Sequence, residues 1–197
     1  MSSRRDQPQL SGLDPSYDRQ VAIDAARWVT ADGARDAAAA IGADAVVVDI
    51  HVVEVRGEAP ARRQRITLVA GEGIVGERRR AAGNPRHQQV TLVEHEAVSR
   101  AIELCGAFSA ADTRRNVLTR GVALNHLVGR DFVIGEVVLR GIELCDPCAR
   151  LARFTSRAFE KALVNRGGLR AEIISGGDIV VGAVVRLAAQ PELQGRS

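Results

Sequence analysis

Val137-Val138-Leu139-Arg140-Gly141-Ile142-Glu143-Leu144 is a β-rich run, and Cys145-Asp146-Pro147-Cys148 follows it directly. A helical pattern begins after Cys148, so these two cysteines lie where a strand gives way to a helix. The partial positive charge of a helix N-terminus, together with Arg150 and Arg153 one turn on, favours a thiolate there. A thiolate at this junction can ligate a soft metal, carry sulfur or exchange disulfides.

Short β-rich runs recur on both sides of this junction, with few helical patterns among them. Because strands and helices do not alternate strictly, a doubly wound parallel sheet is not expected. We predict a mainly β, α+β fold in which the strands form a closed or nearly closed barrel. The predicted strands are Val46–Val55, Ile66–Val69, Gln89–Val93, Val117–Thr119, Phe132–Ile134, Glu136–Leu144, Leu169–Ile174, Ile179–Val181 and Val184–Leu187, with helices near 94–104 and 148–166.

The chain of 197 residues is expected to form one domain with an N-terminal extension. Residues 1–44 are predicted to form a disordered tail followed by helices, the last of them running through Ile41 with Gly42 as its stop. The barrel is predicted over residues 45–190, and residues 191–197 form a second tail. The helix after Cys148 is expected to bury one face that includes Phe154.

Composition narrows the class of protein. Hydrophobic residues make up 46% and charged residues 26%, which is typical of a globular protein. No apolar run approaches the roughly 20 residues of a membrane span, and no secretory signal is visible. Three cysteines imply no disulfide framework, so the cytoplasm is the expected compartment.

The basic residues are nearly all arginine. Lys161 is the only lysine among 27 basic residues, and the net charge is +3. Coding bias and anion binding both explain this preference, since guanidinium groups match phosphate geometry. With aromatic residues at 3%, the chain lacks the stacking platforms of a nucleic-acid binder.

Several interpretations of the cysteine pair stay open from local sequence. A structural zinc site needs four ligands, and neither Cys105 nor the four histidines (His51, His87, His95, His126) show a second paired spacing. A thioredoxin-type redox pair belongs in a βαβ context, whereas a β-hairpin precedes this pair. The remaining interpretations are one working thiolate beside a bystander, and two buried structural cysteines.

Two further stretches could bind an anion. In Thr113-Arg114-Arg115-Asn116, Arg114 and Asn116 are two residues apart at a strand entry and should point the same way. They could hold a phosphate or a planar polar ring. Gly73–Arg79 is glycine-rich and charged, with Arg86-His87 downstream. Its backbone N–H groups and arginines could cradle an anion, although a mobile surface loop explains the same composition.

These stretches, in this order, resemble the MOSC domain, the molybdenum cofactor sulfurase C-terminal family. The resemblance covers roughly Ala45 to Ala188. The matching segments are Gly73–Arg79 with Arg86–Leu92, Arg114–Gly121, Leu124–Gly135, Cys145–Cys148, Leu169-Arg170 and Gly176–Gly182.

The resemblance implies a β-barrel related in architecture to the pyruvate kinase barrel domain, and an association with molybdenum cofactor or sulfur chemistry. In the reducing members of the family the second cysteine binds molybdenum, a role that carries over to Cys148. Cys145 is then dispensable. The contacts to the pterin phosphate and ring carry over to Arg78, Arg114 and Asn116.

The chain also departs from the family pattern. Glu77 replaces the usual aspartate, and Ala183 stands where the last strand usually has an acid. The pyridoxal phosphate desulfurase domain of fused sulfurases is absent, and Lys161 lies on the polar side of a helix. Pyridoxal phosphate is therefore not expected, and any sulfur must come from a donor.

Two functions follow as hypotheses. The first is a molybdenum-cofactor oxidoreductase that reduces N-hydroxylated substrates, served by a reductase partner. The second is a non-catalytic carrier of sulfur or cofactor, served by a sulfur donor. A cofactor-free regulatory domain is a third.

Overall fold

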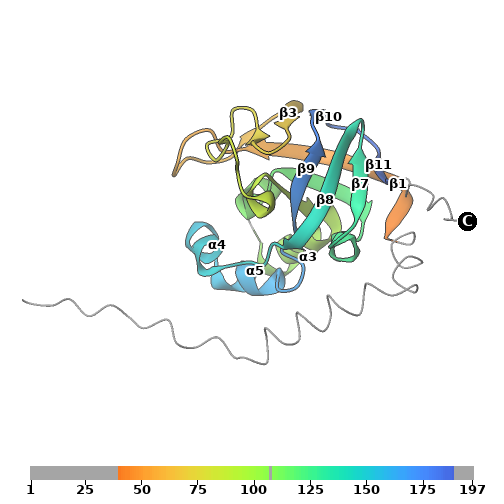
Figure 1. The fold of residues 1–197 in the computed structure, drawn as a ribbon. Helices are drawn as coiled ribbons and strands as arrows, with labels where there is room; N and C mark the ends of the chain where they lie inside the picture. Colours follow the sequence, from red (N-terminus) through yellow and green to blue (C-terminus); the bar gives the residue numbers. More distant parts are fainter. Residues whose placement is uncertain (1–39, 107, 189–197) are drawn as a thin grey trace, which may run out of the picture. The chain divides into compact units, whose positions relative to one another are not determined.

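The computed structural model describes residues 40–106 and 108–188, and of Arg150 only the backbone. Within them the strands form one sheet of eight strands, in the order β11-β7-β8-β9-β5-β6-β1-β2, and one of three, in the order β10-β3-β4 (Figure 1). The strands are β1 (Ile41–Val52), β2 (Ala61–Arg62), β3 (Arg65–Val69), β4 (Gly73–Ile74), β5 (Val90–Glu94), β6 (Val117–Val122), β7 (Asp131–Ile134), β8 (Val137–Leu144), β9 (Leu169–Ser175), β10 (Gly177–Val180) and β11 (Val185–Leu187).

Three α-helices lie together beside the larger sheet: α3 (His95–Cys105), α4 (Ala149–Phe154) and α5 (Arg157–Ala162) (Figure 1). They share a small apolar cluster in which Ala101, Leu151 and Phe159 are buried. Three short 3₁₀ turns, η1 (Arg86–Gln88), η2 (Ala110–Thr113) and η3 (Leu124–Leu127), connect strands. Ser156 begins α5, since its Oγ accepts a hydrogen bond from the Phe159 N–H at 3.1 Å.

The α+β class is confirmed, but the sheet does not close into a barrel. Its strands pair antiparallel except β5 and β6, which are parallel and joined through α3. Among the described residues, the turn before β11 meets the free edge of β1: Val46 and Val184 form an isolated bridge, and Val47 exchanges backbone hydrogen bonds with Gly182 and Ala183. This contact does not extend into a ladder between β11 and β1 in the described part of the chain.

The core is aliphatic, as the composition requires. Its largest cluster draws buried residues from both sheets, so the two sheets pack together through it. Phe132, Leu92 and Leu139 are fully buried there. Truncating one such leucine to alanine typically costs 2–5 kcal/mol.

The predicted strands are found near their expected positions, and two short ones, β2 and β4, were not predicted. The structure corrects three other expectations. Ile41 opens β1 instead of ending a helix, while the rest of the predicted extension lies outside the described residues. The single helix expected over 148–166 is two helices, because the backbone leaves helical geometry at Thr155. This break leaves Phe154 42% exposed instead of buried.

The register of the ladders places the ends of several strands in one row at the same end of the sheet, which we call the site edge. Leu144 pairs with Leu169, Leu169 with Leu92, Leu92 with Val117, and Val117 with Ile50. The end of β8, the start of β9, the start of β6 and the end of β1 therefore lie side by side. The residues that extend beyond this row form the candidate site.

Candidate functional site

A pocket of about 130 Å³ opens at this edge of the sheet. It brings together all four residues that the sequence nominated: Arg78, Arg114, Asn116 and Cys148. They come from the loop after β4, the entry to β6 and the segment after β8. The other lining residues are His51, Val53, Pro60, Glu77, Arg79, Gln88, Gln89, Thr91, Thr113, Arg115, Cys145, Asp146, Leu151 and Arg170.

The two cysteines of the motif differ in exposure. Cys145 is 2% exposed and Cys148 is exposed, and neither is in a disulfide. Cys148 is the N-cap residue of α4, so Pro147 lies directly before the cap. The thiol that a ligand can reach from outside is therefore Cys148.

Arg115, which the sequence analysis passed over, holds the cysteine segment. Its guanidinium donates to the carbonyl oxygens of Cys145 at 2.7 Å, Gly167 at 2.8 Å and Thr113 at 3.2 Å. A longer contact of 3.5 Å reaches the Asp146 carbonyl. Burial lowers the pKa of the Arg115 guanidinium, which remains a cation at neutral pH.

Strand alternation would have turned Arg115 away from Arg114 and Asn116. Arg114 instead adopts a left-handed backbone with φ +57°, which breaks the alternation, and Arg115 lines the same pocket. Nothing in a single sequence signals this conformation at an arginine, because non-glycine residues rarely adopt it.

Asn116 shares the pocket, but the protein's own groups occupy its side-chain amide. Its Oδ1 accepts from the Thr91 N–H at 3.1 Å and the Thr91 hydroxyl at 2.8 Å. Its Nδ2 donates to the His51 carbonyl at 3.2 Å and to Glu77 Oε2 at 3.3 Å. These four bonds use the full hydrogen-bonding capacity of an amide side chain. Asn116 therefore ties β1, β5 and the loop after β4 together.

Glu77 forms part of the same wall. Besides Asn116, its Oε2 accepts a hydrogen bond from the Val53 N–H at 2.8 Å. Burial raises the pKa of Glu77, and the hydrogen bond from Val53 and the charges of Arg78 and Arg79 oppose this rise. The carboxylate thus fixes the loop that carries both arginines.

Arg78 and Arg114 have different surroundings at the pocket. The Arg78 backbone N–H donates to the Val53 carbonyl at 2.9 Å, while its side-chain Nε is buried and finds no hydrogen-bond partner among the described residues. The Arg114 Nη2 donates to the Glu58 carbonyl at 3.0 Å, and its guanidinium stacks 4.5 Å from the ring centroid of Phe154. Arg114 thereby joins the loop after β1 to α4.

The charge of the pocket is positive. Its lining includes five arginines (Arg78, Arg79, Arg114, Arg115, Arg170) and two carboxylates (Glu77, Asp146). A second, more open hollow shares Arg79, Gln88 and Arg170 with it, so the two are continuous. A ligand too large for the pocket can extend into this hollow, and the charge favours an anion.

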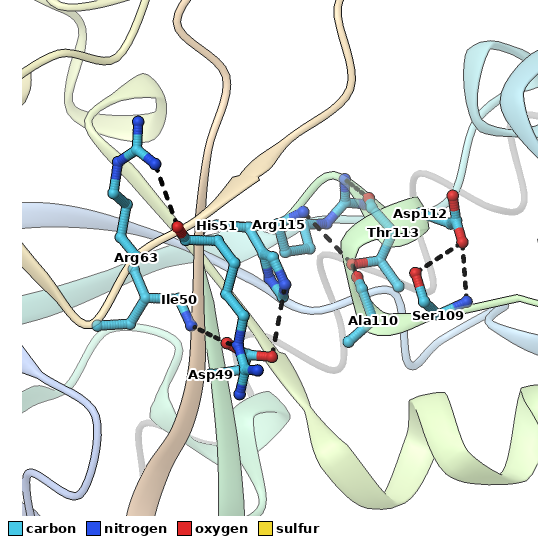
Figure 2. A network of polar contacts seen from close by, with 10 residues as sticks. Asp49, Ile50, His51, Arg63, Ser109, Ala110, Asp112, Thr113 and Arg115 are labelled. Carbon is cyan, nitrogen blue, oxygen red and sulfur yellow. Dashed lines mark hydrogen bonds and ion pairs between the residues drawn. The ribbon is translucent and has the colours of Figure 1, made fainter.

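Figure 2 shows the polar contacts behind the pocket wall. Asp49 accepts from Arg62 Nε at 2.8 Å and lies 3.6 Å from His51 Nε2, and burial lowers the pKa of His51. Beyond it, Ser109 and Asp112 form a capping box that begins η2. The Thr113 hydroxyl donates to the Ala110 carbonyl at 2.6 Å. These contacts fix the turn that presents Arg114 and Arg115.

Within residues 40–106 and 108–188, no group of three or more His, Cys, Asp or Glu side chains could hold a metal ion. In the same part of the chain, no helix is long and apolar enough to span a membrane.

The family model of the MOSC domain matches residues 73–186, which is more than half of the chain. The chain belongs to the MOSC domain family. The match runs from β4 through β11, so it includes both arginine-bearing segments and the cysteine pair of this MOSC domain.

Solved structures share the fold of this MOSC domain. The YuaD protein from Bacillus subtilis superposes with a TM-score of 0.62 at 15% identity, over 72% of this chain and 94% of that one. YiiM from Geobacillus stearothermophilus gives 0.60 at 18% identity, over 74% and 75%. YiiM from Escherichia coli gives 0.54 at 18% identity, over 75% and 70%. No curated protein matches the sequence.

Proposed function

We propose that this MOSC domain binds the molybdenum cofactor in the pocket beside Cys148, with the Cys148 thiolate as a ligand to the metal. The observation that carries the proposal is the meeting of one exposed thiol with an arginine-rich pocket. A soft thiolate suits a metal that already carries dithiolene sulfur, and arginines suit the cofactor's phosphate.

The residues present fit such a group. The buried Nε of Arg78 has no hydrogen-bond partner among the described residues, and an anionic ligand would offset the charge of its guanidinium. Arg114 presents a guanidinium held by Glu58 and Phe154 at the same pocket. Because its amide is fully engaged, Asn116 serves in this proposal to support the wall of the site. The continuous open hollow leaves room for a ligand larger than the pocket.

When bound, the cofactor supplies a redox-active metal, and the activity we propose is the reduction of N-hydroxylated compounds with electrons from a reductase partner. This chain's own residues bind the cofactor, orient it and hold it in the pocket. The arginines fix the anionic end of the ligand, and Cys148 fixes its metal end. A working thiol requires a reducing compartment, so the proposal includes the cytoplasm.

The test compares two single variants in a host that makes the cofactor. We expect the Cys148→Ser protein to purify without molybdenum, and the Cys145→Ser protein to retain most of it. Cys105→Ser, a change on α3, is the matched control and should retain all of it. Metal analysis per chain gives the readout. If the wild-type protein from such a host contains no molybdenum, the proposal is wrong.

Equal loss in the two motif variants would instead favour a thiol redox pair. In that case the oxidised protein should contain a Cys145–Cys148 disulfide, which peptide mapping under non-reducing conditions would detect.

The exposure of Cys148 favours one second candidate, a carrier of sulfur. A carrier should gain the mass of one sulfur atom on Cys148 when a persulfide donor is supplied, and should do so without molybdenum. Intact-mass analysis of wild type and Cys148→Ser, each incubated with the donor, separates this function from cofactor binding.

A further inference from the structure

We infer that Arg115 is a positioning residue that sets where the Cys148 thiol projects, by clamping the backbone of the cysteine segment against the start of β9. Its guanidinium donates to the main-chain carbonyls of Thr113, Cys145, Asp146 and Gly167. One guanidinium thus ties together three separate stretches of chain that meet at the edge of the sheet. The inference goes beyond the proposed function, because it holds whether or not the pocket takes a cofactor.

On the side opposite Arg115, the cysteine segment packs against Gly167 and Gly168, which we call the glycine corner. The Cys145 N–H donates to the Gly168 carbonyl at 2.7 Å, while the Cys145 carbonyl accepts from Arg115. A methyl group on Gly167 would lie 2.5 Å from the Cys145 oxygen and 2.7 Å from Pro147 Cδ. The backbone of Cys145 to Pro147 therefore fits between Arg115 and this corner with no spare room.

Lysine cannot replace this arrangement. A guanidinium presents five N–H donors in a fixed plane, whereas an ammonium is a point charge with three donors on a flexible stem. Arg115 donates to the Cys145 and Gly167 carbonyls from two N–H groups of one rigid plane, and only arginine has such a group. The last carbonyl in the clamp belongs to Asp146, two residues before Cys148, so the clamp holds the backbone that leads to that thiol.

The test measures how fast the buried Cys145 thiol is alkylated under native conditions, with Cys105 as internal control. In the wild type Cys145 should be protected. In Arg115→Ala its alkylation should accelerate at least about tenfold, since losing one hydrogen bond to a charged group changes an opening equilibrium by that much. The rate at Cys105 should stay unchanged, because Cys105 ends α3 and is not one of the residues to which the Arg115 guanidinium donates.

Chemical rescue separates the clamp from general loss of stability. Guanidinium ion at low millimolar concentration should occupy the space left in Arg115→Ala and restore protection of Cys145, whereas methylammonium should not. Guanidinium ordinarily weakens folded proteins, so a protective effect has the opposite sign to a non-specific one.

Arg115→Lys provides a second variant in case the alanine protein does not fold. It keeps the charge and loses the planar fork, so Cys145 alkylation should still accelerate while the rate at Cys105 stays unchanged. Protection of Cys145 equal to wild type in Arg115→Lys, or failure of guanidinium to restore it in Arg115→Ala, would overturn the inference. Because these readouts need no molybdenum, an apoprotein that passes them would separate this inference from a failed cofactor proposal.

Discussion

Two groups of pocket residues use similar side chains in opposite ways. We call Arg115 and Asn116 the floor of the pocket, and Arg78, Arg114 and Cys148 its rim. On the floor, Arg115 and Asn116 donate to or accept from backbone and side-chain groups of the protein itself. On the rim, the Cys148 thiol is exposed and the buried Arg78 Nε has no hydrogen-bond partner among the described residues. Floor residues hold the fold at the site, whereas rim residues have capacity for a ligand. Changes on the floor should therefore cost stability, and changes on the rim should cost binding.

The largest effect is expected on the floor, from Asn116→Ala. The change removes four hydrogen bonds in a partly buried site: the Thr91 N–H loses its side-chain acceptor, and Glu77 keeps the hydrogen bond from Val53 but loses the one from Asn116. We expect a loss of about 3 kcal/mol or more in the free energy of unfolding, measured by urea denaturation. Asn125→Ala is the matched control. Its Nδ2 makes one exposed bond to the Asn165 carbonyl, so its loss should stay below about 1 kcal/mol.

If Asn116→Ala lowered the free energy of unfolding no more than Asn125→Ala does, the division of the pocket residues into floor and rim would be wrong.

The next effect tests the corner beneath the cysteine segment. Gly167→Ala would place a methyl group 2.5 Å from the Cys145 carbonyl oxygen, so the backbone must move. We expect a loss of about 2 kcal/mol, typical of overpacking, again from urea unfolding. In the control Gly42→Ala the nearest atom would lie at 3.4 Å, and the change should stay within about 0.5 kcal/mol. Similar stability of the two variants would mean that the backbone of the cysteine segment moves aside at little cost in free energy.

A rim change should show the reverse pattern. Arg114→Ala removes the contact with Phe154 and the bond to Glu58, and a cation–π contact at an exposed site is worth about 1 kcal/mol or less. Thermal unfolding should therefore change little, while the molybdenum content of the purified protein should fall severalfold. Arg100→Ala, which breaks an exposed ion pair with Glu103 on α3, should leave both unchanged. A large fall in stability with unchanged metal content would place Arg114 on the floor.

The smallest effect concerns pH. Burial raises the pKa of Glu77 above its ordinary value of 4.5, so the folded chain binds this proton more tightly than the unfolded chain does. This group's contribution to stability therefore decreases as pH rises from 4.5 through the raised pKa. Glu77→Gln removes the titration and keeps an oxygen for the Val53 N–H. Relative to wild type, the variant should gain stability as pH rises through this window, measured by urea unfolding at several pH values. A pH-independent difference would contradict this.

Sequence patterns predicted the fold better than they predicted the site. Short β-rich runs located the strands, because the apolar residues in these runs build the core, as Leu139 of β8 does. These runs could not show whether the sheet closes, since closure depends on how the turn around Gly182 and β11 meet the free edge of β1, which lies far away in the sequence. The two-residue strands β2 and β4 are too short to carry a pattern.

At the site, motifs nominated residues that do meet in one pocket, but they did not distinguish floor from rim. Arg115 was missed because strand alternation assumed an extended Arg114, whose backbone is left-handed. Asn116 lines the pocket, yet its four bonds depend on Thr91, His51 and Glu77, which come from three other parts of the chain. Hydrogen-bond saturation is a property of the assembled structure.

The pocket lining runs from His51 to Arg170 along the chain, and its floor is closed by the pairing of β5 with β9 and with the parallel β6. Such long-range and parallel pairings form slowly, because the chain must close large loops before the contacts stabilise them. On the ribosome, no binding pocket can exist until Arg170 has emerged. Any ligand that needs the whole lining can then be loaded only onto a chain that has already completed its sheet. Loading would thus act as a check on folding quality.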